Sequence, residues 1–131
     1  MKIDITEVRE WLNRYAATLA HGSASDIAAY WEIPAHLFTE SEDITFETAF
    51  KVEAHASHEQ LYYETTGVHY VIPGVEQYDE LGPDLVALQV TWTNMDYDDN
   101  YIGSDRANYV LHRDGEGSLR IRTATPRKKL D

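Results

Sequence analysis

The spacing of hydrophobic and polar residues predicts helices in the first half of the chain and strands in the second. Behind a capping residue at Asp4 or Thr6, apolar side chains recur at helical spacing until Gly22 ends the segment. The apolar stripe of this first helix consists of Val8, Leu12, Tyr15 and Leu19. A helix with one such stripe packs that face against the rest of the fold.

A second, shorter helix is expected directly afterwards. Ser23 or Ser25 supplies a capping hydroxyl. We expect this helix to carry Trp31 and to end at Pro34, because proline disrupts a helix interior.

Residues 48–65 predict a third helix, which Gly67 closes, with an extended strand over residues 45–52 as the alternative for its start. Two short strands, residues 36–39 and 44–46, precede it on either side of an acidic turn. The residues of the third helix at apolar spacing are Phe50, Ala54, Ser57 and Leu61. We expect this stripe to be its buried face.

The rest of the chain predicts four long strands joined by turns. The first, residues 68–78, contains Pro73-Gly74, which indicates a bulge or kink at that point. Two more are expected over residues 106–112 and 119–124. The clearest alternation places Val86, Leu88, Val90 and Trp92 on the inner face of the sheet, and Gln89, Thr91 and Thr93 on the outer face.

Length and charge restrict the class of protein. A chain of 131 residues is expected to form one domain, residues 1–131. With 11 Lys and Arg against 23 Asp and Glu, its net charge of −12 disfavours nucleic acid as a partner. The sequence has no cysteine and no apolar run long enough to span a membrane, so we expect a cytoplasmic protein without disulfides.

Two regions of the sequence resemble nuclear transport factor 2-like proteins, in particular ketosteroid isomerases and SnoaL-like cyclases. At the start, residues 14–22 and 26–31 share an Arg-Tyr pair, a glycine stop and an aromatic end with that family. Residues 90–92 and 107–111 are similar to its later strands. The resemblance implies an α+β, cone-shaped NTF2-like fold, in which three N-terminal helices pack inside a curved, mostly antiparallel mixed sheet.

The resemblance also implies a conical pocket that binds a small hydrophobic ligand without a cofactor. Its lining would comprise Tyr15, Trp31, Phe38, Thr39, Val86, Leu88, Val90, Trp92, Ala107 and Tyr109. In relatives, the outer sheet face often joins two subunits, so a homodimer is expected. That face would carry Gln89, Thr91, Arg106, Asn108, His112 and Arg122.

A catalytic role is the alternative to binding alone. Tyr15 matches the tyrosine that stabilises an oxyanion in ketosteroid isomerases. The positions of that family's two carboxylic acids fall on Thr39 and Tyr109, and a threonine hydroxyl is no base near neutral pH. Binding is therefore the preferred function. If the protein is an isomerase, cyclase or epoxide hydrolase, the remaining candidates for a base are Asp105, Glu40 and His55.

Two further patterns carry possible chemistry. His55, His58 and Glu59 share one helix face and could hold zinc, but no further ligand is apparent, so we expect a solvated polar face and no metal. Asp105-Arg106 is similar to the Asp-Arg pairing of epoxide hydrolases with this fold. As strand neighbours they face opposite sides of the sheet, which leaves Asp105 on the inner face.

Overall fold

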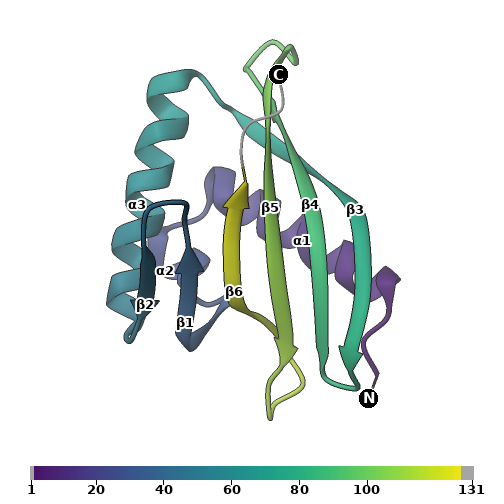
Figure 1. Ribbon diagram of the computed structural model, residues 1–131. Coiled ribbons are helices and arrows are strands. Elements are labelled where there is room, and N and C mark those ends of the chain that lie inside the picture. Colours follow the sequence, from purple (N-terminus) through teal and green to yellow (C-terminus); the bar gives the residue numbers. More distant parts are fainter. Residues whose placement is uncertain (1, 128–131) are drawn as a thin grey trace.

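A computed structural model describes residues 2–127, which form three helices and six strands (Figure 1). The helices are α1 (Ile5–His21), α2 (Ala24–Ala28) and α3 (Ala49–Thr66). The strands are β1 (Trp31–Phe38), β2 (Asp43–Phe46), β3 (Tyr70–Gly82), β4 (Leu85–Met95), β5 (Tyr101–Arg113) and β6 (Leu119–Arg127).

The strands form one curved, open sheet in the order β2-β1-β6-β5-β4-β3. Only the β1–β6 pair is parallel within the described residues; the other neighbours are antiparallel. Figure 1 shows α1 and α2 behind the sheet and α3 beside β2, so that the opposite sheet face has no helix over it. The predicted α+β architecture is therefore confirmed.

Helix α1 follows its sequence signals closely. The Asp4 carboxylate accepts a hydrogen bond from the backbone N–H of Glu7, which caps the helix. All four residues of the predicted stripe are buried, together with Trp11 and Ala16. The Trp11 indole donates to the carbonyl oxygen of Leu119 and so ties α1 to β6.

Helix α2 is shorter than predicted. Ser23 and Asp26 form a capping box, but the helix ends at Ala28. Trp31 instead begins β1, where it pairs with Ile121 of β6. Pro34 lies inside this strand, where the register of the β1–β6 ladder shifts. A proline without an N–H fits where the ladder is already interrupted, so it ends no helix here.

Strand β3 is longer than predicted and is not broken at Pro73-Gly74. Pro73 pairs with Trp92 and Gly74 with Thr91, while the register shifts after Val75 and again after Glu80. The strand lies at the edge of the sheet, where proline needs no partner on its open side.

Helix α3 has the predicted position but buries a different face. Thr48 caps it, and Gly67 ends it with a positive φ of 80°. Val52 and Ala56 are buried, whereas Phe50 and Leu61 are 76% and 56% exposed. The predicted stripe therefore faces outward.

The physical reason for this reversal lies in what the inner face of α3 contacts. Gln60, a polar residue, turns inward and donates to the carbonyl oxygens of Leu19 and Gly22 at the end of α1. Since its other inward residues include the small Ala56 and partly polar side chains, this face carries no strong apolar signal.

The alternation along β4 is confirmed. Val86, Leu88, Val90 and Trp92 are buried and belong to a single cluster of core residues. On the other face, Gln89 and Thr91 both donate to the Glu76 carboxylate of β3.

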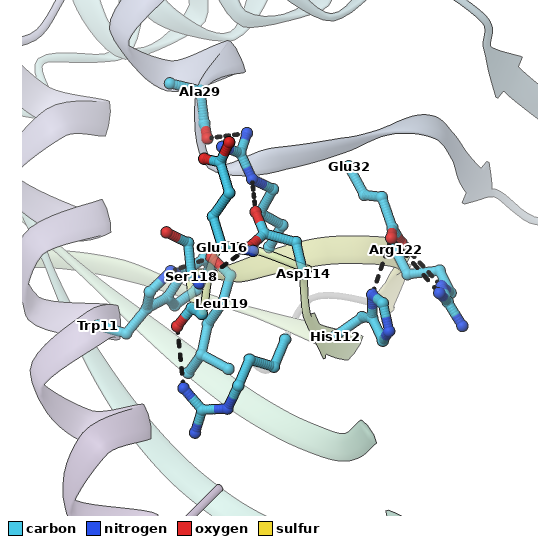
Figure 2. Close-up of polar contacts among 12 residues, drawn as sticks. Trp11, Ala29, Glu32, His112, Asp114, Glu116, Ser118, Leu119 and Arg122 are labelled. Carbon is cyan, nitrogen blue, oxygen red and sulfur yellow. Dashed lines mark hydrogen bonds and ion pairs between the residues drawn. The ribbon is translucent and has the colours of Figure 1, made fainter. Parts of the chain in front are cut away.

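Ion pairs join strands across the outer face of the sheet. Figure 2 shows Glu32 of β1 between His112 of β5 and Arg122 of β6. Partial burial tends to raise the pKa of Glu32, but hydrogen bonds from Arg122 and His112 outweigh it and lower the pKa below its ordinary value. Arg106 pairs similarly with Glu76. These contacts connect β1, β6 and β5 at one end of the face and β5 and β3 at the other.

Candidate functional site

A cavity of about 410 Å³ lies between helices α1 and α3 and the inner face of the sheet. Its apolar wall includes Leu19, Ile27, Leu37, Val52, Ala56, Ala107, Ala124 and Pro126. Its aromatic and polar wall consists of Tyr15, Trp31, His55, His58, Glu59, Tyr62, Tyr63, Trp92, Asp105, Arg106, Tyr109 and Arg127. This volume falls in the range of pockets that enclose small organic molecules.

Two tryptophan–tyrosine pairs form the polar centre of this wall. The Trp31 indole N–H donates to the Tyr15 hydroxyl oxygen at 3.1 Å, and the Trp92 indole donates to the Tyr109 hydroxyl at 3.0 Å. Because an indole N–H only donates, each hydroxyl keeps its own proton. Among residues 2–127, neither hydroxyl proton has an acceptor within hydrogen-bonding distance.

Both hydroxyls remain protonated near neutral pH. Burial raises the pKa of Tyr15 well above its ordinary value, and the charge of Glu59 adds to the effect. Burial and Glu59 likewise raise the pKa of Tyr109. Tyr63 of α3 has a pKa raised by burial and by Glu59 as well. The cavity therefore presents neutral phenol donors.

Asp105 adds a carboxylate to the cavity. Its Oδ2 accepts a hydrogen bond of 3.0 Å from the side-chain amide of Asn94, on the neighbouring strand. Asn94 is only 7% exposed, and its own carbonyl oxygen is buried without a partner among the described residues. Asp105 pairs in register with Trp92, so the carboxylate lies next to the Trp92 indole on the inner face.

The polar residues of α3 lie at the cavity, which corrects the expectation of a fully solvated face. His55 and His58 both line it, and the His55 imidazole is 3.3 Å from the Glu59 carboxylate. No group of three metal-ligating side chains occurs within residues 2–127. The arrangement provides hydrogen-bonding and charged groups around an apolar volume.

The structure brings together part of the predicted site. Tyr15, Trp31, Trp92, Asp105, Ala107 and Tyr109 all line the cavity. The predicted residues outside its lining are Phe38, Thr39, Glu40, Val86, Leu88 and Val90.

Four of these six residues are placed elsewhere for a local reason. Leu88 and Val90 pack within the core on the same inner face as Trp92. The Thr39 hydroxyl donates to the carbonyl of Glu42 and closes the turn between β1 and β2. Glu40 lies in that turn, so it does not reach the cavity.

Sequence reasoning missed the aromatic contribution of α3. Tyr62 and Tyr63 both line the cavity. Two adjacent tyrosines in a helix without a strong apolar stripe were the sequence feature that could have indicated this contribution.

Solved structures of similar shape define the class of protein. A domain of unknown function with a cystatin-like fold from Nostoc punctiforme is 16% identical, with a TM-score of 0.72, covering 98% of this chain and 78% of that one. Aln2 from a Streptomyces species is 15% identical, with a TM-score of 0.71 and coverages of 98% and 94%. The yeast UBP3-associated protein BRE5 is 12% identical, with a TM-score of 0.70 and 98% of both chains covered. At these identities the likeness establishes a shared cystatin-like, NTF2-like fold.

The family is defined by the sequence itself. Residues 6–129 match the family described as NTF2-like protein (DUF6841), and the chain belongs to that family. No curated protein matches the chain. Within the described residues, no helix is long and apolar enough to cross a membrane.

Proposed function

We propose that this protein binds a small hydrophobic molecule that carries a hydrogen-bond acceptor, and holds it in the cavity between α1, α3 and the sheet. The observation that carries the proposal is the pair of phenol hydroxyls of Tyr15 and Tyr109, each with a proton still to donate in a largely apolar cavity. A ketone, lactone or phenol oxygen is the matching acceptor.

The two kinds of wall would contribute differently to such a complex. Burial of roughly 200 Å² of apolar ligand surface is worth about 5 kcal/mol before the cost of association. One neutral hydrogen bond from a tyrosine adds about 0.5–1.5 kcal/mol. Affinity would therefore come mainly from the apolar wall, while the hydroxyls would select the orientation of the ligand.

The test begins with mass spectrometry of molecules that co-purify with the protein and with thermal-shift screening of ketones, lactones and phenols. Ala107→Leu places extra methyl groups in the cavity and should abolish the shift given by any hit. Ala54→Leu makes the same change on the exposed face of α3 and should leave the shift intact. Equal shifts in both variants would refute the cavity as the binding site.

Catalysis without a cofactor is a second candidate, favoured because Tyr15 and Asp105 line the same cavity. In an isomerase, cyclase or epoxide hydrolase, Tyr15 would stabilise a developing oxyanion and Asp105 or His55 would act as the base. Tyr15→Phe should then lower turnover by roughly two to three orders of magnitude. If the protein only binds, the same change should lower affinity about tenfold at most.

The helix-free outer face of the sheet supports the expectation of a homodimer. Its middle carries uncharged side chains such as Ala87, Gln89 and Asn108. Arg106 and Arg122, at its periphery, are each paired with a carboxylate. A monomeric mass in sedimentation at micromolar concentration would contradict the dimer. The cytoplasmic location stays a prediction, which cell fractionation tests.

A further inference from the structure

Near Asp105, two hydrogen-bond acceptors on the inner face of the sheet lack a donor among the described residues. Asn94 donates to Oδ2 of Asp105, which leaves Oδ1 without a hydrogen-bond partner among residues 2–127. The carbonyl oxygen of Asn94 is also unpaired within the same range, although this side chain is more than nine-tenths buried. A buried acceptor without a donor is costly. Because Asn94 is outside the cavity lining, Oδ1 of Asp105 is the acceptor that an incoming N–H group would reach.

The charge around the cavity points in the same direction. Besides Asp105, Glu59 also lines the cavity. Its negative charge contributes to the raised pKa values of Tyr15, Tyr63 and Tyr109. In the described part of the chain, no cationic side chain forms an ion pair with Asp105. Arg106, its neighbour in sequence, also lines the cavity, but its guanidinium is paired with Glu76 on the outer face, which offsets its charge.

The remaining basic side chains that line the cavity are Arg127, His55 and His58. Arg127 is exposed to solvent, which weakens its effect on the interior. His55 lies against Glu59. His58 is exposed as well. An anionic ligand would therefore meet two carboxylates, whereas a cation would be attracted by them.

The aromatic wall offers a second interaction to a cation. Trp92 and Asp105 are register partners on the inner face, so a group bound to the carboxylate lies beside the indole ring. The ring edge is held by the bond from its N–H to Tyr109. A cation close to a tryptophan face gains additional electrostatic attraction.

We propose that the ligand of this cavity is a protonated amine with an apolar body, for which Asp105 is the anionic anchor and Asn94 a positioning residue. The ammonium donates to Oδ1 of Asp105, and the apolar body packs against the wall opposite. Asn94 acts through Asp105 by fixing the carboxylate rotamer. This inference rests on the proposed binding function and adds the class of ligand; an acceptor oxygen elsewhere in the molecule would still meet Tyr15 and Tyr109.

Three probes of similar size and different charge are compared: benzylamine, benzyl alcohol and benzoate. Their dissociation constants are measured at pH 7 by ligand-observed NMR for wild type, Asp105→Asn, Asn94→Ala and the control Glu64→Gln. Glu64 is an exposed residue of α3 outside the cavity lining, so its substitution removes one negative charge without touching the site.

Benzylamine should bind wild type at least tenfold more tightly than benzyl alcohol, with benzoate weakest, because a charged hydrogen bond is about twice as strong as a neutral one. Asp105→Asn should weaken benzylamine about ten- to a hundredfold and change benzyl alcohol by less than about twofold. Asn94→Ala should weaken benzylamine selectively by a smaller factor. Glu64→Gln should match wild type.

The outcomes separate the inference from the function on which it rests. If benzyl alcohol or benzoate binds as tightly as benzylamine, or if Asp105→Asn weakens all three alike, the amine proposal is wrong. If that binding is still blocked by Ala107→Leu, the cavity remains a binding site. If none of the probes binds wild type, the amine proposal fails, and the thermal-shift screen alone then decides the broader function.

Discussion

Replacement of Tyr15 by phenylalanine tests how the cavity wall is built. The Tyr15 hydroxyl is the acceptor for the Trp31 indole N–H at 3.1 Å. Tyr15 and Trp31 are only 4% and 5% exposed. Without the hydroxyl, a buried N–H is left unpaired, which costs about 1–3 kcal/mol. For a domain of this length, that corresponds to a fall in Tm of roughly 3–5 °C per kcal/mol.

A double-mutant cycle isolates this bond from the loss of packing. Trp31→Phe removes the donor, so Tyr15→Phe should cost less in that background than in wild type. The expected coupling is about 1 kcal/mol, obtained from urea unfolding followed by circular dichroism with an unchanged denaturant slope. Additivity within about 0.3 kcal/mol would refute the bond as a stabilising contact.

Tyr30→Phe is the matched control for loss of a tyrosine hydroxyl. The Tyr30 hydroxyl accepts from Thr18 at 3.3 Å, but the Thr18 hydroxyl also donates to the carbonyl of Arg14 at 2.9 Å. The Thr18 donor therefore keeps a partner in the variant. We expect a loss below about 0.5 kcal/mol.

Three further predictions test individual parts of the fold. Glu32→Gln should destabilise the protein at pH 7. Since the pKa of Glu32 is lowered in the folded state, the difference in unfolding free energy from wild type should shrink as the pH falls below about 4. Urea titrations at pH 7 and at a pH below about 4 measure this difference. Val52→Ala should lower the free energy of unfolding by about 2 kcal/mol and Phe50→Ser by less than about 0.5 kcal/mol, because of these two residues only Val52 is buried. A larger loss of stability at Phe50 would indicate that α3 buries the face predicted from the sequence. Gly67→Ala should lower stability by about 1 kcal/mol because of its positive φ alone, since no atom lies within 4 Å of the added methyl. Gly115→Ala, at a residue without a positive φ, should leave stability nearly unchanged. Thermal melts of both variants compare the two effects.

The sequence by itself determined those features that depend on local spacing. The stripe of α1, its cap at Asp4 and the alternation along β4 are repeated in the structure, because a period near 3.6 or of 2 fixes which side chains share a face. The family resemblance added the arrangement of helices inside a curved sheet. Tyr15, Trp92 and Tyr109 could be assigned to the cavity from these patterns together.

Only the tertiary structure decided which predicted faces meet and where the cavity lies. Trp31 joins β1 because a distant partner, Ile121, completes its ladder, and α3 turns Val52 and Ala56 inward although larger apolar residues lie on its other side. The Asn94–Asp105 contact joins two strands across a hairpin, and the contribution of α3 to the cavity depends on how that helix packs. Some of these contacts join residues far apart in sequence, and others depend on which face of a helix packs better against the sheet. The local sequence pattern does not contain the packing energy that decides between two faces.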